Sequence, residues 1–222
     1  MNITVFAATG GIGRHLVTQA LAAGHRVTAA VRTPDSLAGL PVRTVRVDLS
    51  DPDPAAVRDA VAGADAVLSG LGARSGADIG VARRGTEAMI TAMRAAGVRR
   101  LVVVSAAPIG TVPSPRRPTP PRHDPGDGPF VKYLGSPMIK VVLRKRYADL
   151  ALMEDAVAAS GLDWTTVRPP RLTNGPGTAD YRTALDRNVP GGSAISRADV
   201  AHYMLRALTE PDSVHHTVGI GR

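Results

Sequence analysis

The sequence predicts an α/β protein built on a doubly wound parallel sheet. Short runs rich in β-branched residues alternate with longer segments that have the spacing of an amphipathic helix. Two of the helical segments stop at a glycine, Gly24 and Gly97, the residue type that most often follows a helix. The run Leu101-Val102-Val103-Val104 is apolar throughout, as expected for a strand that helices cover on both faces. Strands and helices in this alternation form parallel sheets with right-handed crossovers.

The first half of the chain keeps this alternation without interruption. Strands are expected at residues 2–7, 26–31, 42–47, 64–69 and 100–105. Helices are expected at residues 11–23, 54–62 and 81–96. In the first of these helices the apolar residues share one side, so this helix should pack against the sheet through Ile12, Leu16, Ala20 and Ala23.

The chain changes character near residue 107. Residues 107–137 hold half of the 18 prolines, and a segment of this length is too long for a plain connection. It is expected to be either disordered or a functional flap over the site. The later elements are expected to be a helix at 138–160 that is broken or bent near Lys145, a strand at 163–167, loops at 172–192, a helix at 196–208 and a closing strand at 217–220. Substrate contacts are expected from residues 107–137 and from the loops at 172–192. Ser196 should cap the last helix, with Asp199 at the third position of a capping box.

Length and composition narrow the class of protein. The 222 residues suit a single domain over residues 1–222, with 44% apolar and 21% charged residues. The absence of cysteine excludes disulfides, thiolate metal sites and cysteine nucleophiles. No apolar run approaches the roughly 20 residues that cross a bilayer, and the N-terminus does not resemble a signal peptide. We therefore expect a cytoplasmic protein.

The net charge of +8 allows three kinds of partner: a nucleic acid, a membrane surface or an anionic small ligand. The positive residues are not concentrated in one long run, and only 3% of the residues are aromatic and able to stack bases. We therefore expect a small-molecule substrate, no nucleic acid and no membrane. The sequence leaves open whether the chain is a monomer or a homodimer.

A glycine-rich run stands between the first strand and the first helix. Thr9-Gly10-Gly11-Ile12-Gly13 is in the context that a phosphate-binding loop needs, because the free N–H groups and the helix dipole favour negative charge. The third glycine of the common pattern is absent, since Leu16 stands there. The run still predicts a Rossmann-type nucleotide site, with the pyrophosphate on this loop.

The end of the second strand favours NADP over NAD. NAD-binding sites place an acid there, whereas this chain has Val31-Arg32, and an arginine can bind a 2′-phosphate in a fork. Arg14 in the first turn of the helix is a second candidate for that phosphate. Asp48 could accept a hydrogen bond from the adenine amino group, or it could cap the following helix. The residues expected to contact NADP(H) are Thr9, Gly10, Gly11, Ile12, Gly13, Arg14, Arg32, Asp48, Leu49, Gly70, Leu71, Gly72, Ser105 and Ala106.

These motifs resemble a known superfamily. The first half contributes Ala8-Thr9-Gly10-Gly11-Ile12-Gly13, Val31-Arg32, Asp48, Leu68-Ser69-Gly70-Leu71-Gly72 and Val104-Ser105. The second half contributes Ser160-Gly161-Leu162-Asp163-Trp164, Arg168-Pro169-Pro170 and Ile195-Ser196-Arg197-Ala198-Asp199-Val200-Ala201. Together they resemble the atypical short-chain dehydrogenase/reductases, and most closely the NAD(P)H-binding group with the NmrA-like proteins and the biliverdin IXβ/flavin reductases.

The resemblance implies a Rossmann core, bound NADPH and hydride transfer to a flat conjugated acceptor such as a flavin, a quinone or a linear tetrapyrrole. Two departures affect the proton donor. The Tyr-x-x-x-Lys dyad of the wider superfamily is absent, because Tyr147 is followed four residues later by Ala151. Arg171 also stands at a position where histidine occurs in flavin-reductase relatives.

Ser105 and Tyr147 are the candidate catalytic residues. Ser105, at the end of the fifth strand, could bind a substrate carbonyl or a water, or it could only cap local backbone. Tyr147 could reach the site from the following helix, or it could be a packing residue. Glu154 lies on the same helix face two turns on, where it could orient a site residue or form a surface ion pair with an arginine. Solvent is the remaining proton source.

Four histidines and an arginine are further candidates. Arg122 and His123 lie in the proline-rich segment and could touch substrate when it closes. The pair His215-His216 has no further ligand at useful spacing, so no metal is expected. His202 is expected on a helix surface.

Three functions fit the sequence. The first is an NADPH-dependent reductase. The second is a non-catalytic NADP(H) sensor that signals to a partner, which the missing dyad favours. The third is an isomerase or dehydratase that keeps its NADP bound. Steady NADPH oxidation with an added acceptor would separate the first from the other two.

Overall fold

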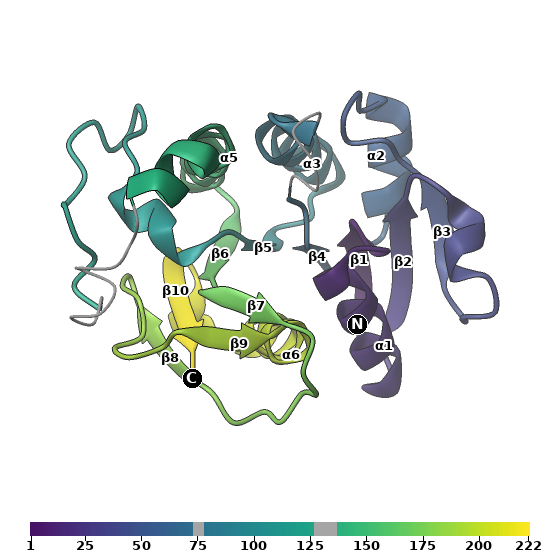
Figure 1. Cartoon of the computed structure of the whole chain (residues 1–222). Coiled ribbons are helices and arrows are strands. Elements are labelled where there is room, and N and C mark those ends of the chain that lie inside the picture. The colour runs from purple at the N-terminus through teal and green to yellow at the C-terminus, as the bar shows by residue number, and fades with distance from the viewer. Residues whose placement is uncertain (73–77, 127–136) are drawn as a thin grey trace.

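The computed structural model describes residues 1–72, 78–126 and 137–222, and of residues 137–143 only the helical backbone. Its centre is an eight-stranded sheet in the order β3-β2-β1-β4-β5-β6-β10-β8 (Figure 1). Every neighbouring pair in this sheet is parallel except β10 and β8, which are antiparallel. The predicted doubly wound sheet is therefore confirmed.

The strands and helices lie close to their predicted bounds. The strands of the central sheet are β1 (Asn2–Phe6), β2 (Arg26–Val31), β3 (Arg43–Arg46), β4 (Ala66–Ser69), β5 (Arg100–Val104), β6 (Asp163–Arg168), β8 (Arg182–Leu185) and β10 (His216–Gly221). The helices are α1 (Gly11–Ala22), α2 (Pro54–Val61), α3 (Val81–Ala96), α5 (Pro137–Ala158) and α6 (Arg197–Arg206). Short 3-10 turns form η1 (Pro34–Leu37), η3 (Ala107–Thr111), η4 (Ala207–Thr209) and η5 (Pro211–Ser213).

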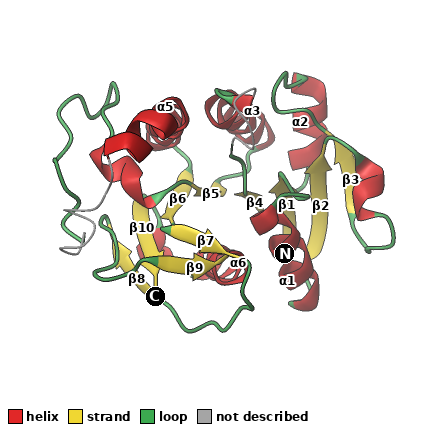
Figure 2. Ribbon diagram, in the orientation of Figure 1, coloured by secondary structure: helices red, strands yellow, loops and turns green. Residues whose placement is uncertain are grey.

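Helices cover both faces of the sheet. Helices α1 and α6 lie on one face, and α2, α3 and α5 lie on the other (Figure 2). Strand β5 is apolar throughout because both of its faces are covered. Val102 and Val104 belong to the core on the α1 side, whereas Leu101 and Val103 belong to the core on the α3 side. In the described part of the chain no helix is long and apolar enough to cross a membrane.

Two expectations about the second half differ from the structure. The break near Lys145 is absent, because α5 runs without interruption from Pro137 to Ala158, and the alternative of a bend stays a prediction. The stretch from residue 138 to 158 contains neither proline nor glycine, and Arg and Lys are good helix formers, so nothing local interrupts it. The loops predicted at 172–192 contain β8. They also separate β7 (Arg171–Thr173) from β9 (Ala194–Ser196), which pair in a small parallel sheet.

The cap of α6 is confirmed. The Ser196 hydroxyl accepts a hydrogen bond from the Asp199 N–H at 2.9 Å and donates to the Asp199 carboxylate at 2.9 Å. The same carboxylate accepts the N–H groups of Thr178 and Ala179 at 2.7 and 2.9 Å. Burial alone would raise the pKa of Asp199, but these donors hold that pKa below its usual range. The carboxylate therefore fixes both the start of α6 and the loop before β8.

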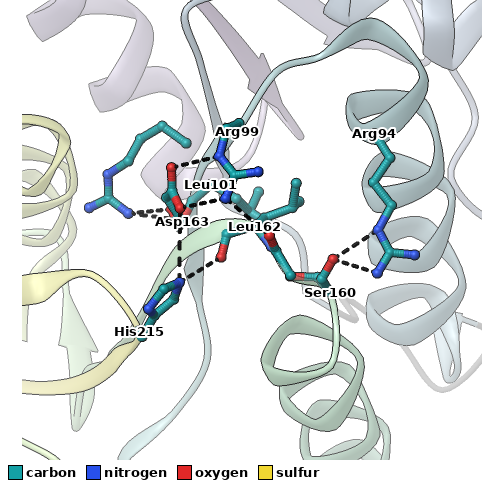
Figure 3. Close-up of polar contacts among 9 residues, drawn as sticks. Arg94, Arg99, Leu101, Ser160, Leu162, Asp163 and His215 are labelled. Atoms are coloured by element: carbon teal, nitrogen blue, oxygen red, sulfur yellow. Dashed lines mark hydrogen bonds and ion pairs between the residues drawn. The ribbon is translucent and has the colours of Figure 1, made fainter.

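Arginines tie the elements together at the amino ends of β5 and β6 (Figure 3). Arg94 of α3 donates from Nε to the Ser160 carbonyl at 2.8 Å, and Arg99 pairs with Asp163 at 3.0 and 3.1 Å. The Nε2 atom of His215 lies 3.0 Å from the Leu162 carbonyl. Since each of these groups meets a partner within the fold, this edge of the sheet serves structure.

Candidate nucleotide site

The glycine-rich loop makes a tight turn between β1 and α1. Ala7, directly after β1, has a φ of +55°, and the Gly10 N–H donates to the Ala7 carbonyl at 2.8 Å. Gly10 is the N-cap of α1, whose first turn contains no acidic residue. The first N–H groups of a helix have no partner inside the helix, so this turn presents donors and the positive end of a dipole.

Two glycines bring backbone against backbone here. A Cβ atom on Gly13 would lie 2.1 Å from the Ala7 carbonyl oxygen, so only glycine lets α1 approach the end of β1. A Cβ atom on Gly70 would lie 3.4 Å from the Gly13 nitrogen, which places the loop after β4 beside the start of α1. The strand order reverses between β1 and β4, and such switch points are where open α/β sheets bind ligands.

A pocket opens at this switch point. Of the predicted cofactor residues, those that line it are Thr9, Gly10, Arg32, Asp48, Leu49, Gly70, Leu71 and Gly72. Those that do not line it are Gly11, Ile12, Gly13, Arg14, Ser105 and Ala106. Seven further lining residues were not predicted, which are Ala7, Ala30, Val31, Val47, Ser50, Asp78 and Val81. The positions of the strands could have indicated four of these, since Ala7, Ala30, Val31 and Val47 stand at or next to the carboxyl ends of parallel strands.

The charged residues of the pocket have distinct settings. Arg32 is exposed at the carboxyl end of β2 and lines the pocket. Asp48 accepts hydrogen bonds from the Ser50 hydroxyl and N–H at 2.6 and 2.9 Å, and these bonds hold its pKa below the usual range. Asp48 does not cap α2, because Asp53 does so by accepting the Ala55 N–H at 2.9 Å. Arg14 is exposed and lies outside the pocket lining.

Ser105 follows the last residue of β5. Its N–H donates to the Val167 carbonyl at 2.7 Å, which fixes the backbone at the carboxyl end of the sheet. Its hydroxyl is buried and has no hydrogen-bond partner among the described residues. The alternative that this hydroxyl caps local backbone is therefore wrong. A buried hydroxyl without a partner costs free energy, and such groups often mark the place of a ligand or water.

Tyr147 lies on α5, half-buried, two turns before Glu154. Seven residues of helix rise about 10 Å. Glu154 binds Arg168, the last residue of β6, and Tyr147 lies on the same helix about two turns before that contact. Burial raises the pKa of the Tyr147 phenol, which makes it a weaker acid than a tyrosine beside a lysine.

Glu154 forms a buried ion pair rather than a surface one. Its carboxylate meets the Arg168 guanidinium at 2.9 and 2.5 Å, with 8% and 7% of the two side chains exposed. Arg117 approaches the same carboxylate at 4.0 Å. The pair joins α5 to the end of β6, and so Glu154 orients the strand end from which Pro169 and Pro170 continue.

The described part of the proline-rich segment, residues 107–126, is anchored to the body. The Ser114 hydroxyl donates to Asp155 at 2.9 Å, and Arg117 donates to the carbonyls of Ile109 and Val112. The buried Asp124 carboxylate accepts the Asn188 N–H at 2.7 Å. Arg122 and His123 are exposed, so their predicted contact with substrate stays a prediction. Residues 127–136 of the predicted flap lie outside the described residues.

The remaining histidines have local partners. His202 is half-buried and its Nδ1 lies 2.7 Å from the Tyr181 hydroxyl, so it is not the plain surface residue that was predicted. His216 pairs with Asp186 at 2.6 Å. Among the described residues, no three His, Cys, Asp or Glu side chains are grouped closely enough to hold a metal ion.

Comparison with known proteins agrees with this geometry. The family described as NAD(P)H-binding matches residues 7–211. The chain is 29% identical to the uncharacterized chloroplastic protein At2g34460 of Arabidopsis thaliana, over 99% of this chain and 76% of that protein. It is 28% identical to the uncharacterized sugar epimerase YhfK of Bacillus subtilis, over 96% of this chain and 90% of that protein.

Solved structures share the fold. The oxidoreductase ylbE of Lactococcus lactis has a TM-score of 0.80 at 18% identity, covering 100% of this chain and 91% of that one. A short-chain dehydrogenase/reductase of Veillonella parvula in complex with NADP has a TM-score of 0.75 at 18% identity, over 100% and 94%. The putative NADH-flavin reductase SP1627 of Streptococcus pneumoniae has a TM-score of 0.73 at 24% identity, over 100% and 99%.

Proposed function

The chain belongs to the NAD(P)H-binding family, and we propose that it is an NADPH-dependent reductase that transfers hydride to a flat conjugated acceptor. The single observation that carries the proposal is the pocket at the switch point, where a glycine-rich helix start, Arg32 and the loop after β4 converge. Flavins, quinones, biliverdin-like compounds and other enones or carbonyl compounds are the acceptor classes in question.

The residues present fit a dinucleotide. Gly13 and Gly70 let the start of α1 lie close to the ends of β1 and β4, and the first turn of α1 offers N–H donors to a diphosphate. Arg32 at the end of β2 favours the 2′-phosphate of NADP, since the position carries a guanidinium in place of the acid that NAD sites use. Arg14, in the first turn of α1, is the second candidate for that phosphate.

The chemistry divides between cofactor and protein. Bound NADPH would supply the hydride, and the protein supplies orientation and a proton source. The Ser105 hydroxyl, buried and without a partner, is placed to hydrogen-bond an acceptor oxygen or a water at the end of β5. Tyr147 or solvent delivers the proton that balances the transferred hydride. Because burial raises the pKa of Tyr147, this phenol stays protonated at neutral pH and would be a weak general acid, and solvent is the alternative donor.

The experiment follows NADPH oxidation with flavins, quinones and biliverdins, together with binding titrations of NADPH and NADH. Turnover with NADPH preferred over NADH supports the reductase. Tight NADPH binding with no turnover on any acceptor contradicts the reductase. The sensor and the NADP-retaining isomerase then remain. Failure to bind either nucleotide rejects the site itself. The double variant Ser105→Ala with Tyr147→Phe then tests the residues, since unchanged turnover would make solvent the proton source.

A second function has one specific observation in its favour. Tyr147 has no lysine four residues on, and its pKa is raised rather than lowered, so the acid of the wider superfamily is weak here. A protein of this kind could bind NADP(H) and report its redox state to a partner. The name of the Bacillus relative, a sugar epimerase, adds the possibility of a reaction that returns the hydride to its substrate. Net NADPH consumption distinguishes the reductase from both.

A further inference from the structure

Arg197 reaches the glycine-rich loop from the far end of the sequence. It is the first residue of α6, yet its side chain lies against Gly11, the first residue of α1. A Cβ atom built on Gly11 would stand 2.6 Å from the Arg197 Cδ and 2.7 Å from its Nε. Glycine at position 11 therefore leaves the space that the arginine side chain occupies.

The backbone that carries Arg197 is held in place. Ser196 and Asp199 cap the start of α6 through their mutual hydrogen bonds. The Gln19 side chain donates to the Ala198 carbonyl at 2.9 Å, which ties α1 to the first turn of α6. The guanidinium is oriented as well, because its Nη1 donates to the Asn174 side-chain oxygen at 2.5 Å. Asn174 is neutral, so it positions the guanidinium without neutralising it.

This placement sets a cation beside the positive end of a helix. The first turn of α1 contains no acid, and Arg197 forms no ion pair with any carboxylate of the described residues. A guanidinium next to unpaired helix N–H groups is an unfavourable arrangement unless an anion joins them. The diphosphate of a dinucleotide would supply this negative charge, because it binds at the start of the first helix in proteins of this fold.

We propose that Arg197 is a phosphate-binding residue of the dinucleotide site, whose guanidinium pairs with the diphosphate bridge of bound NADP(H). The inference rests on the proposed cofactor site and adds a residue from the second half of the chain to it. Arg32 and Arg197 then have separate tasks. Arg32 recognises the 2′-phosphate that only NADP(H) carries, and Arg197 recognises the diphosphate that NADP(H) and NAD(H) share.

The assignment links the cofactor to the small β7-β9 sheet. Asn174 directly follows β7, and Ser196 ends β9 immediately before Arg197. Residues 171–196 also contain the segment from which substrate contacts are expected. A diphosphate bound by Arg197 would thus stabilise the position of both strands, so cofactor binding should order the substrate side of the pocket.

The test compares NADPH and NADH binding to the wild-type chain and to Arg197→Gln, Arg197→Lys, Arg32→Gln and a control, Arg58→Gln. Arg58 is exposed on α2, on the opposite face of the sheet from α1 and α6. Arg197→Gln should weaken NADPH and NADH by the same factor, about 10- to 100-fold, the usual range for a lost charge-assisted hydrogen bond. Arg197→Lys should retain part of the affinity, Arg32→Gln should weaken only NADPH, and Arg58→Gln should change neither.

Three results would overturn the assignment. If Arg197→Gln binds NADPH within about twofold of the wild type, the guanidinium does not meet the diphosphate, and the proposed reductase function is untouched. If Arg197→Gln lowers NADPH affinity and spares NADH, the residue serves the 2′-phosphate instead. A wild-type chain that binds neither nucleotide rejects the cofactor site and this inference together. Thermal unfolding of each variant shows whether a loss of affinity comes from a loss of folded protein.

Discussion

Arginines at the two ends of the central sheet have different surroundings. At the amino ends of β5 and β6, Arg94 and Arg99 bind the Ser160 carbonyl and the Asp163 carboxylate. At the carboxyl ends of β1 and β2, Arg32 and Arg197 lie beside the glycine-rich loop and pair with no carboxylate of the described residues. The same residue type therefore joins elements at one end of the sheet and stands without a carboxylate partner among the described residues at the other.

The buried Glu154–Arg168 pair gives the sharpest test of this contrast, because Arg168 lies at the carboxyl end of the sheet and yet has a carboxylate partner. Glu154→Ala should lower the free energy of unfolding by about 3–5 kcal/mol, since it removes the carboxylate that binds the buried Arg168 guanidinium through two hydrogen bonds. Urea unfolding measures the change. Glu154→Gln keeps a hydrogen-bond acceptor and should lose less. If both variants unfold like the wild type, Arg168 finds other partners and the pair is not structural.

The pocket arginine should behave in the opposite way. Arg32→Gln should leave the urea midpoint unchanged, because the side chain is exposed and supports no element. It should reduce the preference for NADPH over NADH about 10- to 100-fold, the value of a lost charge-assisted contact to the 2′-phosphate. Competitive titration of the two nucleotides measures it. An unchanged preference would indicate that Arg14, and not Arg32, contacts the 2′-phosphate. The matched variant Arg14→Gln tests this.

The cap of α6 connects stability to the site. Ser196→Ala removes the hydroxyl that accepts the Asp199 N–H, and it should cost about 1 kcal/mol of stability. Since Arg197 is the next residue, the same change should also weaken NADPH binding, by less than Arg197→Gln does. Chemical denaturation and nucleotide titration of one preparation give both values. Lower stability with unaltered affinity would show that Arg197 does not depend on the cap.

The smallest effect is expected at the exposed pair of Arg99 and Asp163. The Arg99 side chain holds the pKa of Asp163 below its usual range. A carboxylate whose pKa is lower in the folded state stabilises above the unfolded pKa, and loses that contribution as the pH falls through the folded pKa. The urea midpoints of the wild type and Asp163→Asn should therefore differ slightly at pH 7 and converge below about pH 4. A gap that persists in acid, or one that survives high salt undiminished, would contradict an electrostatic origin.

Local patterns predicted most of the elements of the fold. Helix α3 has the predicted bounds, Val81–Ala96, because Gly97 takes a φ of +69° and ends it. The cap of α6 followed from the spacing of Ser196 and Asp199 alone. The glycine-rich loop, Arg32 and the Gly70-Leu71-Gly72 run converge on one pocket because parallel strands end at the same edge of a sheet.

The errors arose where local signals are weak. Strands β7, β8 and β9 have only 3, 4 and 3 residues, too few to show a period, and Arg171 and Arg182 open the first two. They form strands because neighbours from elsewhere in the chain pair with them. No break occurs near Lys145, since a cluster of basic residues costs little free energy in an exposed helix turn.

The sequence by itself determined the order of the longer strands and helices, the glycine-rich loop and the resemblance to the family, because each depends on runs of residues that are neighbours in the chain. Only the tertiary structure decided that Glu154 would meet Arg168, that the Ser105 hydroxyl would be buried without a partner, and that Arg197 would lie on Gly11. Gly11 and Arg197 stand 186 positions apart (197 − 11), and no periodicity relates them. Their contact follows from two helices packing on one face of the sheet, which is a property of the folded core.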